Sequence, residues 1–230
     1  MPQASSNRIA PFVAPKDGLF SRPFLVRLGY SFFRQDDGAV AVWRLRSGFV
    51  KLTRCEVGRA LLVGWRSPDW LVGVSSAVLN RRYPVSAYAL TECLVERADI
   101  AAFRCARAVD LELGAEIQEM LSDELHEMAL LVDCLCSRDR RQRLKRLLVK
   151  WFKAGFRADA AALRPLLPLT KRELAEAIDV APEQLSRLLT DFENRHLIRR
   201  LGGTVGLPQG SPLARIVIGS QGGPPAASTI

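Results

Sequence analysis

The stretch DVAPEQLSRLL, residues 179–189, predicts the turn and the second helix of a helix-turn-helix motif. Asp179 lies where a preceding helix must turn, and Asp tolerates the left-handed backbone conformation that such a turn requires. Pro182 suits the first position of a new helix, because its missing N–H would have no partner there. Leu185 and Leu188 then return toward a core, and polar residues alternate with them.

The segment before the turn, residues 170–178, is expected to form the first helix of the motif. Thr170 and Glu173 have the T-x-x-E spacing of a capping box, which defines a helix start. Ala175 is small, as a close helix crossing requires. The side chains expected to face inward are Leu174, Ile178 and Val180. Two helices that cross in an unrelated bundle remain the alternative.

The outward face of the second helix is predicted to read DNA in the major groove. Glu183 can accept a hydrogen bond from cytosine N4, Arg187 can fork onto guanine O6 and N7, and Ser186 can serve several base edges. Taken singly, Glu183 could be a first-turn acid favoured by the helix dipole and Arg187 a solvated residue. The side chains expected to contact the DNA backbone are Thr170, Lys171, Arg172, Gln184, Arg195, Arg199, Arg200 and Thr204.

The positive charge of the chain is concentrated in its C-terminal part. The 230 residues carry a net charge of +9, and residues 137–230 contain 17 basic and 8 acidic residues, a surplus of nine. Residues 1–136 contain 16 of each kind. This asymmetry favours a polyanion as the partner of the C-terminal part, with an idle basic surface as the alternative.

The composition indicates a folded cytoplasmic protein that is not an enzyme. Apolar residues make up 48% of the chain, enough for a core, but no run approaches the roughly 18 that a membrane span needs. The N-terminus lacks the apolar segment of a signal peptide, and the five cysteines have no framework spacing, so we expect reduced thiols. We find no metal-ligand spacing, phosphate-binding Gly-rich loop or nucleophile–base pair.

Residues 19–105 are expected to form a β domain. The stretch AVAVWRLRSGFVKLTR, residues 39–54, alternates apolar and polar residues and breaks at Ser47-Gly48. Further short apolar runs follow, separated by Gly, Pro and Asp, which is typical of a β-sandwich or barrel. Residues 1–18 are polar and contain several prolines, so we expect a mobile arm there.

Residues 106–136 contain no proline and are predicted to form one long helix. An apolar stripe with a spacing near 3.5 favours helix-on-helix packing, most simply across a homodimer axis. Packing of this helix on its own domain alone is the alternative. The expected interface residues are Leu113, Ile117, Met120, Leu121, Leu125, Met128, Leu131, Val132 and Leu135.

The C-terminal part, residues 137–207, is predicted to be a winged helix-turn-helix domain. A basic amphipathic helix over 138–155 precedes the motif. LIRRLGGTVGL, residues 197–207, predicts a hairpin with Gly202-Gly203 at its turn. The Gly-, Pro- and Ser-rich residues 208–230 are expected to be a disordered tail.

The order of these parts resembles the Crp/Fnr family of bacterial transcription regulators over residues 24–207. YSFFRQDDGAVAVWRLRSGFVKLTR (30–54) looks like the opening strands of the family, and LTKRELAEAIDVAPEQLSRLLTDFENRHLIRR (169–200) looks like its DNA-binding motif. Glu183, Ser186 and Arg187 match the E-x-x-S-R pattern of the Fnr branch. The resemblance implies an α+β fold: an N-terminal β-roll, that is, a jelly roll like cyclic-nucleotide-binding domains, then a long dimerisation helix and a C-terminal winged helix-turn-helix.

The resemblance also implies a function and partners. The function is a sequence-specific regulator that binds as a homodimer to an inverted repeat with TTGAT-like half-sites, its recognition helices about 34–36 Å apart. Double-stranded DNA, a second copy of the chain and RNA polymerase are the expected partners, and no membrane is involved. The alternative is a nucleotide- or haem-regulated signalling module that acts through protein partners.

The sequence departs from the effector sites of the family. Gly73 is followed by Val74 where cyclic-nucleotide binders have Glu, and Val85-Ser86-Ala87 lacks their Arg. An unpaired buried phosphate would be costly, so we expect no control by cyclic AMP. The first cysteine is Cys55, which argues against an N-terminal iron–sulfur cluster. We expect no cofactor; haem is the alternative, although His126 and His196 are not obvious axial ligands. The effector stays unknown.

Overall fold

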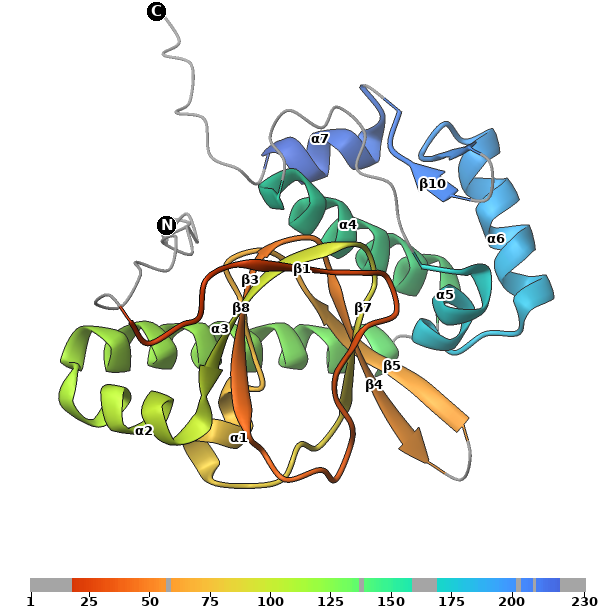
Figure 1. The fold of residues 1–230 in the computed structure, drawn as a ribbon. Coiled ribbons are helices and arrows are strands. Elements are labelled where there is room, and N and C mark those ends of the chain that lie inside the picture. Colours follow the sequence, from red (N-terminus) through yellow and green to blue (C-terminus); the bar gives the residue numbers. More distant parts are fainter. Residues whose placement is uncertain are drawn as a thin grey trace, which may run out of the picture.

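The computed structural model of the chain describes residues 18–56, 59–136, 139–158, 169–201, 204–208 and 210–219. A β domain comes first, a long helix runs along it, and a helical domain with a small hairpin follows (Figure 1). This arrangement confirms the predicted α+β fold class with a β-rich N-terminal part. Among the described residues, no helix is both long and apolar enough to cross a bilayer.

The β domain is built from two antiparallel four-stranded sheets. Gly48 lies between β3 (Ala41–Ser47) and β4 (Val50–Glu56) with φ +86°, and a Cβ there would clash with the backbone oxygen of Glu92, so this turn requires glycine. Apolar side chains such as Leu45 and Val50 are fully buried in the core of this domain. The first sheet has the order β1 (Phe24–Val26), β8 (Cys93–Asp99), β3 (Ala41–Ser47), β6 (Leu71–Val72), and the second the order β2 (Ser31–Phe33), β7 (Ser86–Ala89), β4 (Val50–Glu56), β5 (Arg59–Arg66).

Three helices belong to this part of the chain: α1 (Val74–Leu79), α2 (Ile100–Val109) and α3 (Leu111–Cys136). The single helix predicted over 106–136 is wrong, because the chain breaks at Asp110, whose backbone is extended. The Asp110 carboxylate accepts hydrogen bonds from the N–H groups of Glu112 and Leu113, both at 3.0 Å, and so caps α3. An acid in a helical pattern can thus mark a new helix start.

The first turns of α3 pack on the chain's own β domain. Leu113, Ile117 and Met120 are buried in a core with Leu71 and Phe103, which corrects their prediction as dimer-interface residues. They are covered within one chain because α3 lies along the domain (Figure 1). Leu121 is partly buried against the same core.

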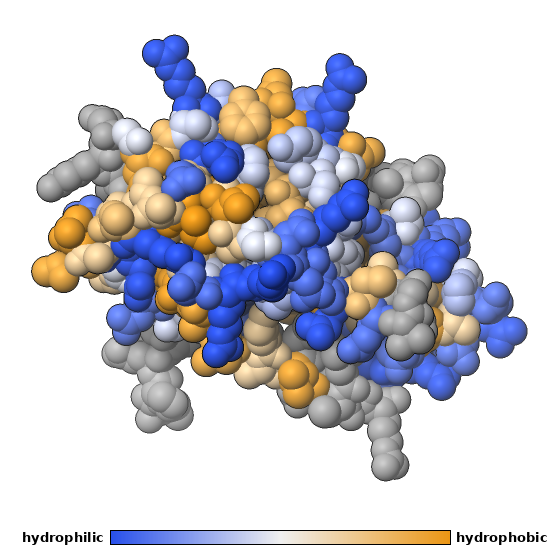
Figure 2. Space-filling view, turned by 60° about the horizontal axis from the view of Figure 1, so that its bottom comes forward, coloured by the Kyte–Doolittle hydropathy of each residue, from blue (hydrophilic) through white to orange (hydrophobic). Residues whose placement is uncertain are grey.

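The second half of α3 presents apolar side chains to solvent. Leu125, Met128 and Val132 are 70%, 49% and 59% exposed. The side chains of Leu131 and Leu135 lie outside the described residues. Hydrophobic residues also gather at the end of the molecule where α2 meets α3 (Figure 2), and the exposed Val109 and Leu111 belong to this corner.

The C-terminal domain packs around a core in which Trp151 and Phe152 are fully buried and to which Trp65 and Leu90 of the β domain also contribute. The expected disordered tail is wrong for residues 212–219, which form a helix; residues 220–230 lie outside the described residues, as do 1–17 and the hairpin turn at 202–203. Leu213 and Val217 bury one face of this helix on α4 (Arg140–Ala158), and the Ser211 hydroxyl caps it by accepting from Ala214 N at 3.1 Å. The elements are α4 (Arg140–Ala158), α5 (Lys171–Ala177), α6 (Pro182–Asn194), β9 (Arg199–Leu201), β10 (Thr204–Gly206) and α7 (Pro212–Gly219).

Candidate nucleic-acid interface

The helix-turn-helix of α5 and α6 is held by short-range interactions. Thr170 Oγ1 accepts a hydrogen bond from Glu173 N at 3.2 Å, and Glu173 Oε2 accepts one from Thr170 N at 2.9 Å, which confirms the predicted capping box. Asp179 has φ +52°, the left-handed conformation expected at the turn. Pro182 begins α6, as predicted. The sequence therefore defines the motif locally, before any tertiary contact is considered.

The helix α6 has one buried and one exposed face. Leu185 and Leu189 are 0% and 1% exposed, and Phe192 continues this buried face into the domain core. Leu188, which was expected in the core, is only partly buried at its edge. The motif thus anchors α6 by three apolar side chains and leaves its other face in solvent.

The three side chains predicted to contact bases, Glu183, Ser186 and Arg187, are all exposed. Ser186 follows Glu183 by three residues and Arg187 comes next, so the three side chains lie close together on one side of α6. The Ser186 hydroxyl donates to Pro182 O at 3.0 Å within the helix. Arg187 makes no ion pair with any described residue, so its guanidinium is available to a partner. A carboxylate, a hydroxyl and a guanidinium together offer both acceptors and donors to base edges.

The predicted backbone contacts differ in their availability. Arg172 pairs with Glu176 at 3.1 Å and Arg195 with Asp191 at 3.0 Å. Lys171 is exposed and makes no ion pair within the described part of the chain. Arg199 is exposed too, Gln184 is half-buried, Thr170 is engaged in the capping box, and the side chain of Thr204 lies outside the described residues.

Arg200 has a structural contact that the sequence did not reveal. Its backbone N–H donates to Glu193 Oε1 at 3.1 Å and its Nε donates to Oε2 at 2.6 Å. These hydrogen bonds lower the pKa of Glu193 below its ordinary value, first through the backbone donor and then through the guanidinium. The clamp joins β9 to the end of α6, so Arg200 orients the hairpin. Residues seven apart across a turn carry no periodic signal in the sequence.

A second contact that sequence reasoning missed ties α6 to α4. The Asp191 carboxylate pairs with two arginines. Arg195, at the end of α6, has its Nε 3.0 Å from Asp191 Oδ1, and Arg141 of α4 has its Nε 3.3 Å from Asp191 Oδ2. Among the described residues, no group of three or more His, Cys, Asp or Glu side chains could hold a metal ion. The chemistry of this surface is therefore that of charged and polar side chains on a rigid helical frame.

Comparisons with known proteins agree with this geometry. Residues 142–216 match the model of the Crp-like helix-turn-helix domain. The chain is similar to the transcriptional activator protein Anr of Pseudomonas protegens, with 28% identity over 196 residues that cover 82% of this chain and 78% of that protein.

Solved structures share the whole fold. FixK2 from Bradyrhizobium japonicum superposes with a TM-score of 0.72 at 18% identity, over 86% of this chain and 96% of the other. TTHB099, a transcriptional regulator of the CRP family from Thermus thermophilus, gives 0.68 at 20% identity, over 84% and 96%. At these identities the likeness concerns the fold.

The exposed recognition face on a helix-turn-helix frame defines a DNA-binding transcription regulator, not an enzyme. The matched domain, the curated relatives and the shared fold make this chain similar to transcription regulators of the Crp/Fnr family. Regulators of this family bind DNA and act as dimers.

Proposed function

We propose that this protein binds, as a homodimer, an inverted repeat with TTGAT-like half-sites. The observation that carries the proposal is the arrangement of α6: Glu183, Ser186 and Arg187 are exposed on the side opposite to the buried leucines. Major-groove readout needs such a row of donors and acceptors on a helix whose other face is anchored. Lys171, at the start of α5, and Arg199, on β9, are exposed and would bind phosphates and set the register.

Selection of bound duplexes from random oligonucleotides tests this proposal, since it reports partner, sequence and symmetry at once. The expected result is an inverted repeat whose half-sites resemble TTGAT. Binding of the selected duplex should weaken steeply with added salt, because neutralised phosphates release counterions. Recovery of single-site or sequence-independent DNA would contradict the proposed mode.

The dimer is proposed to form through the second half of α3. Leu125, Met128 and Val132 continue one stripe, and apolar side chains exposed together on one helix face are typical of an interaction surface. A groove of about 340 Å³ beside the helix, lined in part by Gly114 and Leu121, leaves room for side chains of a second copy. Parallel pairing of two such helices would set the distance between the two recognition helices.

Binding is proposed to be independent of cyclic AMP. Beyond the missing Glu and Arg of the family's nucleotide site, the space next to Gly73 is filled: a Cβ there would lie 3.1 Å from Tyr83 and 3.3 Å from Phe33. The ring of Tyr83 stacks on that of Phe33 at 3.8 Å, and its hydroxyl donates to Ala41 O at 2.7 Å. A nucleotide would have to displace this stack. Calorimetric titration with cyclic AMP should give no heat of binding; tight binding would refute this part.

The division of the chain follows from these roles. We propose that residues 19–105 and 106–136 carry the β domain and the dimer contact, and that 137–207 bind DNA. RNA polymerase is included as a partner, because a DNA-bound regulator must change what the polymerase does. Transcription takes place in the bacterial cytoplasm, which is therefore the proposed location.

A further inference from the structure

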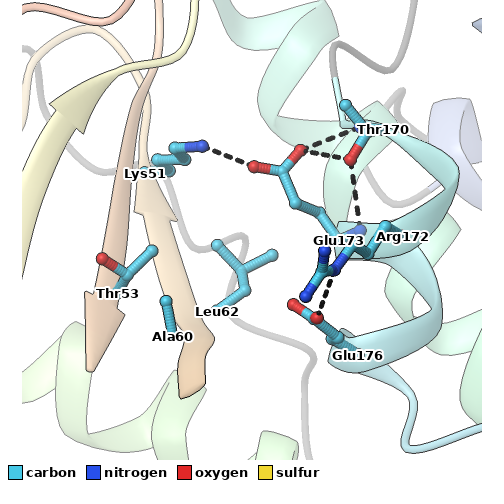
Figure 3. Close-up of a pocket in the computed structure, with 8 residues that line it drawn as sticks. All are labelled: Lys51, Thr53, Ala60, Leu62, Thr170, Arg172, Glu173 and Glu176. Atoms are coloured by element: carbon cyan, nitrogen blue, oxygen red, sulfur yellow. Dashed lines mark hydrogen bonds and ion pairs between the residues drawn. The ribbon is translucent and has the colours of Figure 1, made fainter. Parts of the chain in front are cut away.

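A cleft of about 650 Å³ opens between the β domain and the first helix of the helix-turn-helix, beside the place where α5 meets β5, and the Lys51 side chain reaches across it (Figure 3). Lys51 extends from β4 toward Glu173 on α5. The residues that line the cleft are Lys51, Thr53, Ala60 and Leu62 on the strands and Thr170, Arg172, Glu173 and Glu176 at the helix.

The Glu173 carboxylate has two separate tasks. Its Oε2 accepts hydrogen bonds from Thr170 N and Oγ1, both at 2.9 Å, and so caps α5. Its Oε1 accepts from Lys51 Nζ at 2.5 Å and so holds β4. Partial burial works to raise the pKa of Glu173, but the hydrogen bonds from Lys51 and Thr170 outweigh it and lower the pKa. The start of α5 is therefore coupled directly to a strand of the other domain.

A second contact between the domains lies close to Lys51. The fully buried ring of Trp151, on α4, contacts Phe49 at 4.8 Å and Trp65 at 5.1 Å between ring centroids. Phe49 directly precedes β4, two residues before Lys51, so both contacts arise at the start of the same strand. Leu62 and Leu90 of the β domain pack on the same core, and α5 lies against β5, so the two domains meet over an apolar contact. The ion pair adds a directional, charged attachment at the start of α5.

The ion pair is weaker than the aromatic contact. The side chains of Lys51 and Glu173 are 26% and 18% exposed, so water and salt reach them, and such pairs contribute little to global stability. The aromatic contact is buried and belongs to the core of the C-terminal domain. Loss of the ion pair should therefore change orientation more than it changes folding.

We propose that Lys51 is a positioning residue for DNA recognition, which holds α5 through Glu173 in one orientation relative to the β domain. The helices α5 and α6 share a core, and Val180 N, in the turn between them, donates to Ala175 O of α5 at 3.0 Å, so we expect the two helices to move together. This inference rests on the proposed dimeric DNA binding. When the β domain and α3 set the dimer, the orientation of each α5–α6 unit sets the spacing of the recognition helices.

The test compares Lys51→Met, Glu173→Gln and the double variant in binding to the selected inverted repeat. Gln at 173 keeps an oxygen for the capping box and removes only the charge. Each single variant should weaken binding about three- to tenfold, because two loosened units bind one duplex, and the double variant should be no worse than either single one. Lys51→Arg should restore most of the affinity.

The two charge changes separate positioning from general electrostatics. Lys51→Met removes a positive charge, whereas Glu173→Gln removes a negative one. A plain charge effect would therefore weaken DNA binding by Lys51→Met and tighten DNA binding by Glu173→Gln. Either that result or unchanged binding in both variants overturns the proposal. Arg54→Met is the matched control, since Arg54 lies on the opposite face of β4 and is 48% exposed. It should bind like wild type.

Hydrogen exchange in the free protein provides a measurement that needs no DNA. Amides of residues 171–177 should exchange faster in Lys51→Met, with only a small decrease in the thermal midpoint. Unchanged exchange in α5 would overturn the role of Lys51. A wild-type protein that bound no duplex would refute the proposed function instead, and the exchange result would still decide whether Lys51 restrains α5.

Discussion

Removal of the Arg187 side chain should reduce DNA affinity at one base pair and leave the fold intact. The guanidinium is exposed and has no ion-pair partner among the described residues, so Arg187→Ala leaves no buried group unpaired. Surface changes of this kind alter stability by about 0.5 kcal/mol or less. The loss in binding can therefore be attributed to the contact with DNA.

The magnitude follows from the chemistry of the contact. One bidentate arginine–guanine pair discriminates by about 1–3 kcal/mol. At a factor of ten for about 1.4 kcal/mol, this amounts to about 5- to 140-fold per half-site. A dimer makes the contact twice, so affinity for the inverted repeat should fall by at least about 25-fold.

Fluorescence anisotropy at fixed salt, with two labelled duplexes, isolates the contact. One duplex carries TTGAT half-sites and the other TTAAT, which lacks the G·C pair. Wild type should prefer the first strongly, whereas Arg187→Ala should bind both alike and keep a similar salt dependence. Arg200→Ala is the contrasting variant: it releases Glu193 and should weaken binding to both duplexes equally. An Arg187→Ala protein that lost the same factor on both duplexes would refute base readout by this residue.

Three further predictions concern other parts of the molecule. The double variant Leu125→Glu/Met128→Glu should sediment as a folded monomer, because both side chains are exposed in the single chain and are not needed for its fold. Its DNA binding should weaken together with dimerisation. A persistent dimer would contradict the proposed interface on α3. Asp179→Val should lower the free energy of unfolding by about 1–2 kcal/mol in urea titration, since a β-branched residue is strained at φ +52°, whereas Asp179→Gly should not; equal effects would contradict the turn. Because the folded state lowers the pKa of Glu173, its carboxylate stabilises the fold above its ordinary pKa of 4.5, and this contribution is lost as pH falls through the lower folded value. In urea titration, wild type should therefore lose its advantage in unfolding free energy over Glu173→Gln in acid. Parallel pH profiles of the two proteins would exclude this linkage.

The helix-turn-helix was predictable from sequence because its signals act over short range. The capping box, the proline at the first position of α6 and the left-handed Asp179 each depend on residues within four positions of one another. The outward side of α6 followed from the same periodicity, since the apolar residues that anchor one face determine which residues occupy the other.

The features that sequence reasoning missed depend on contacts between distant residues. Lys51 and Glu173 are 122 positions apart, and no pattern along the chain relates them. The helix α7 follows a Gly- and Pro-rich stretch, and packing of its apolar face on α4 outweighs that composition.

The sequence by itself determined the DNA-binding motif, the alternation of the strands and the apolar stripe of α3, because local hydrogen bonds and side-chain periodicity act along the chain. Only the tertiary structure decided what covers that stripe. Leu113 and Ile117 face the chain's own β domain, whereas Leu125 and Met128 do not. Periodicity specifies that a helix face is apolar, but the identity of its neighbour depends on how the whole chain folds back upon itself.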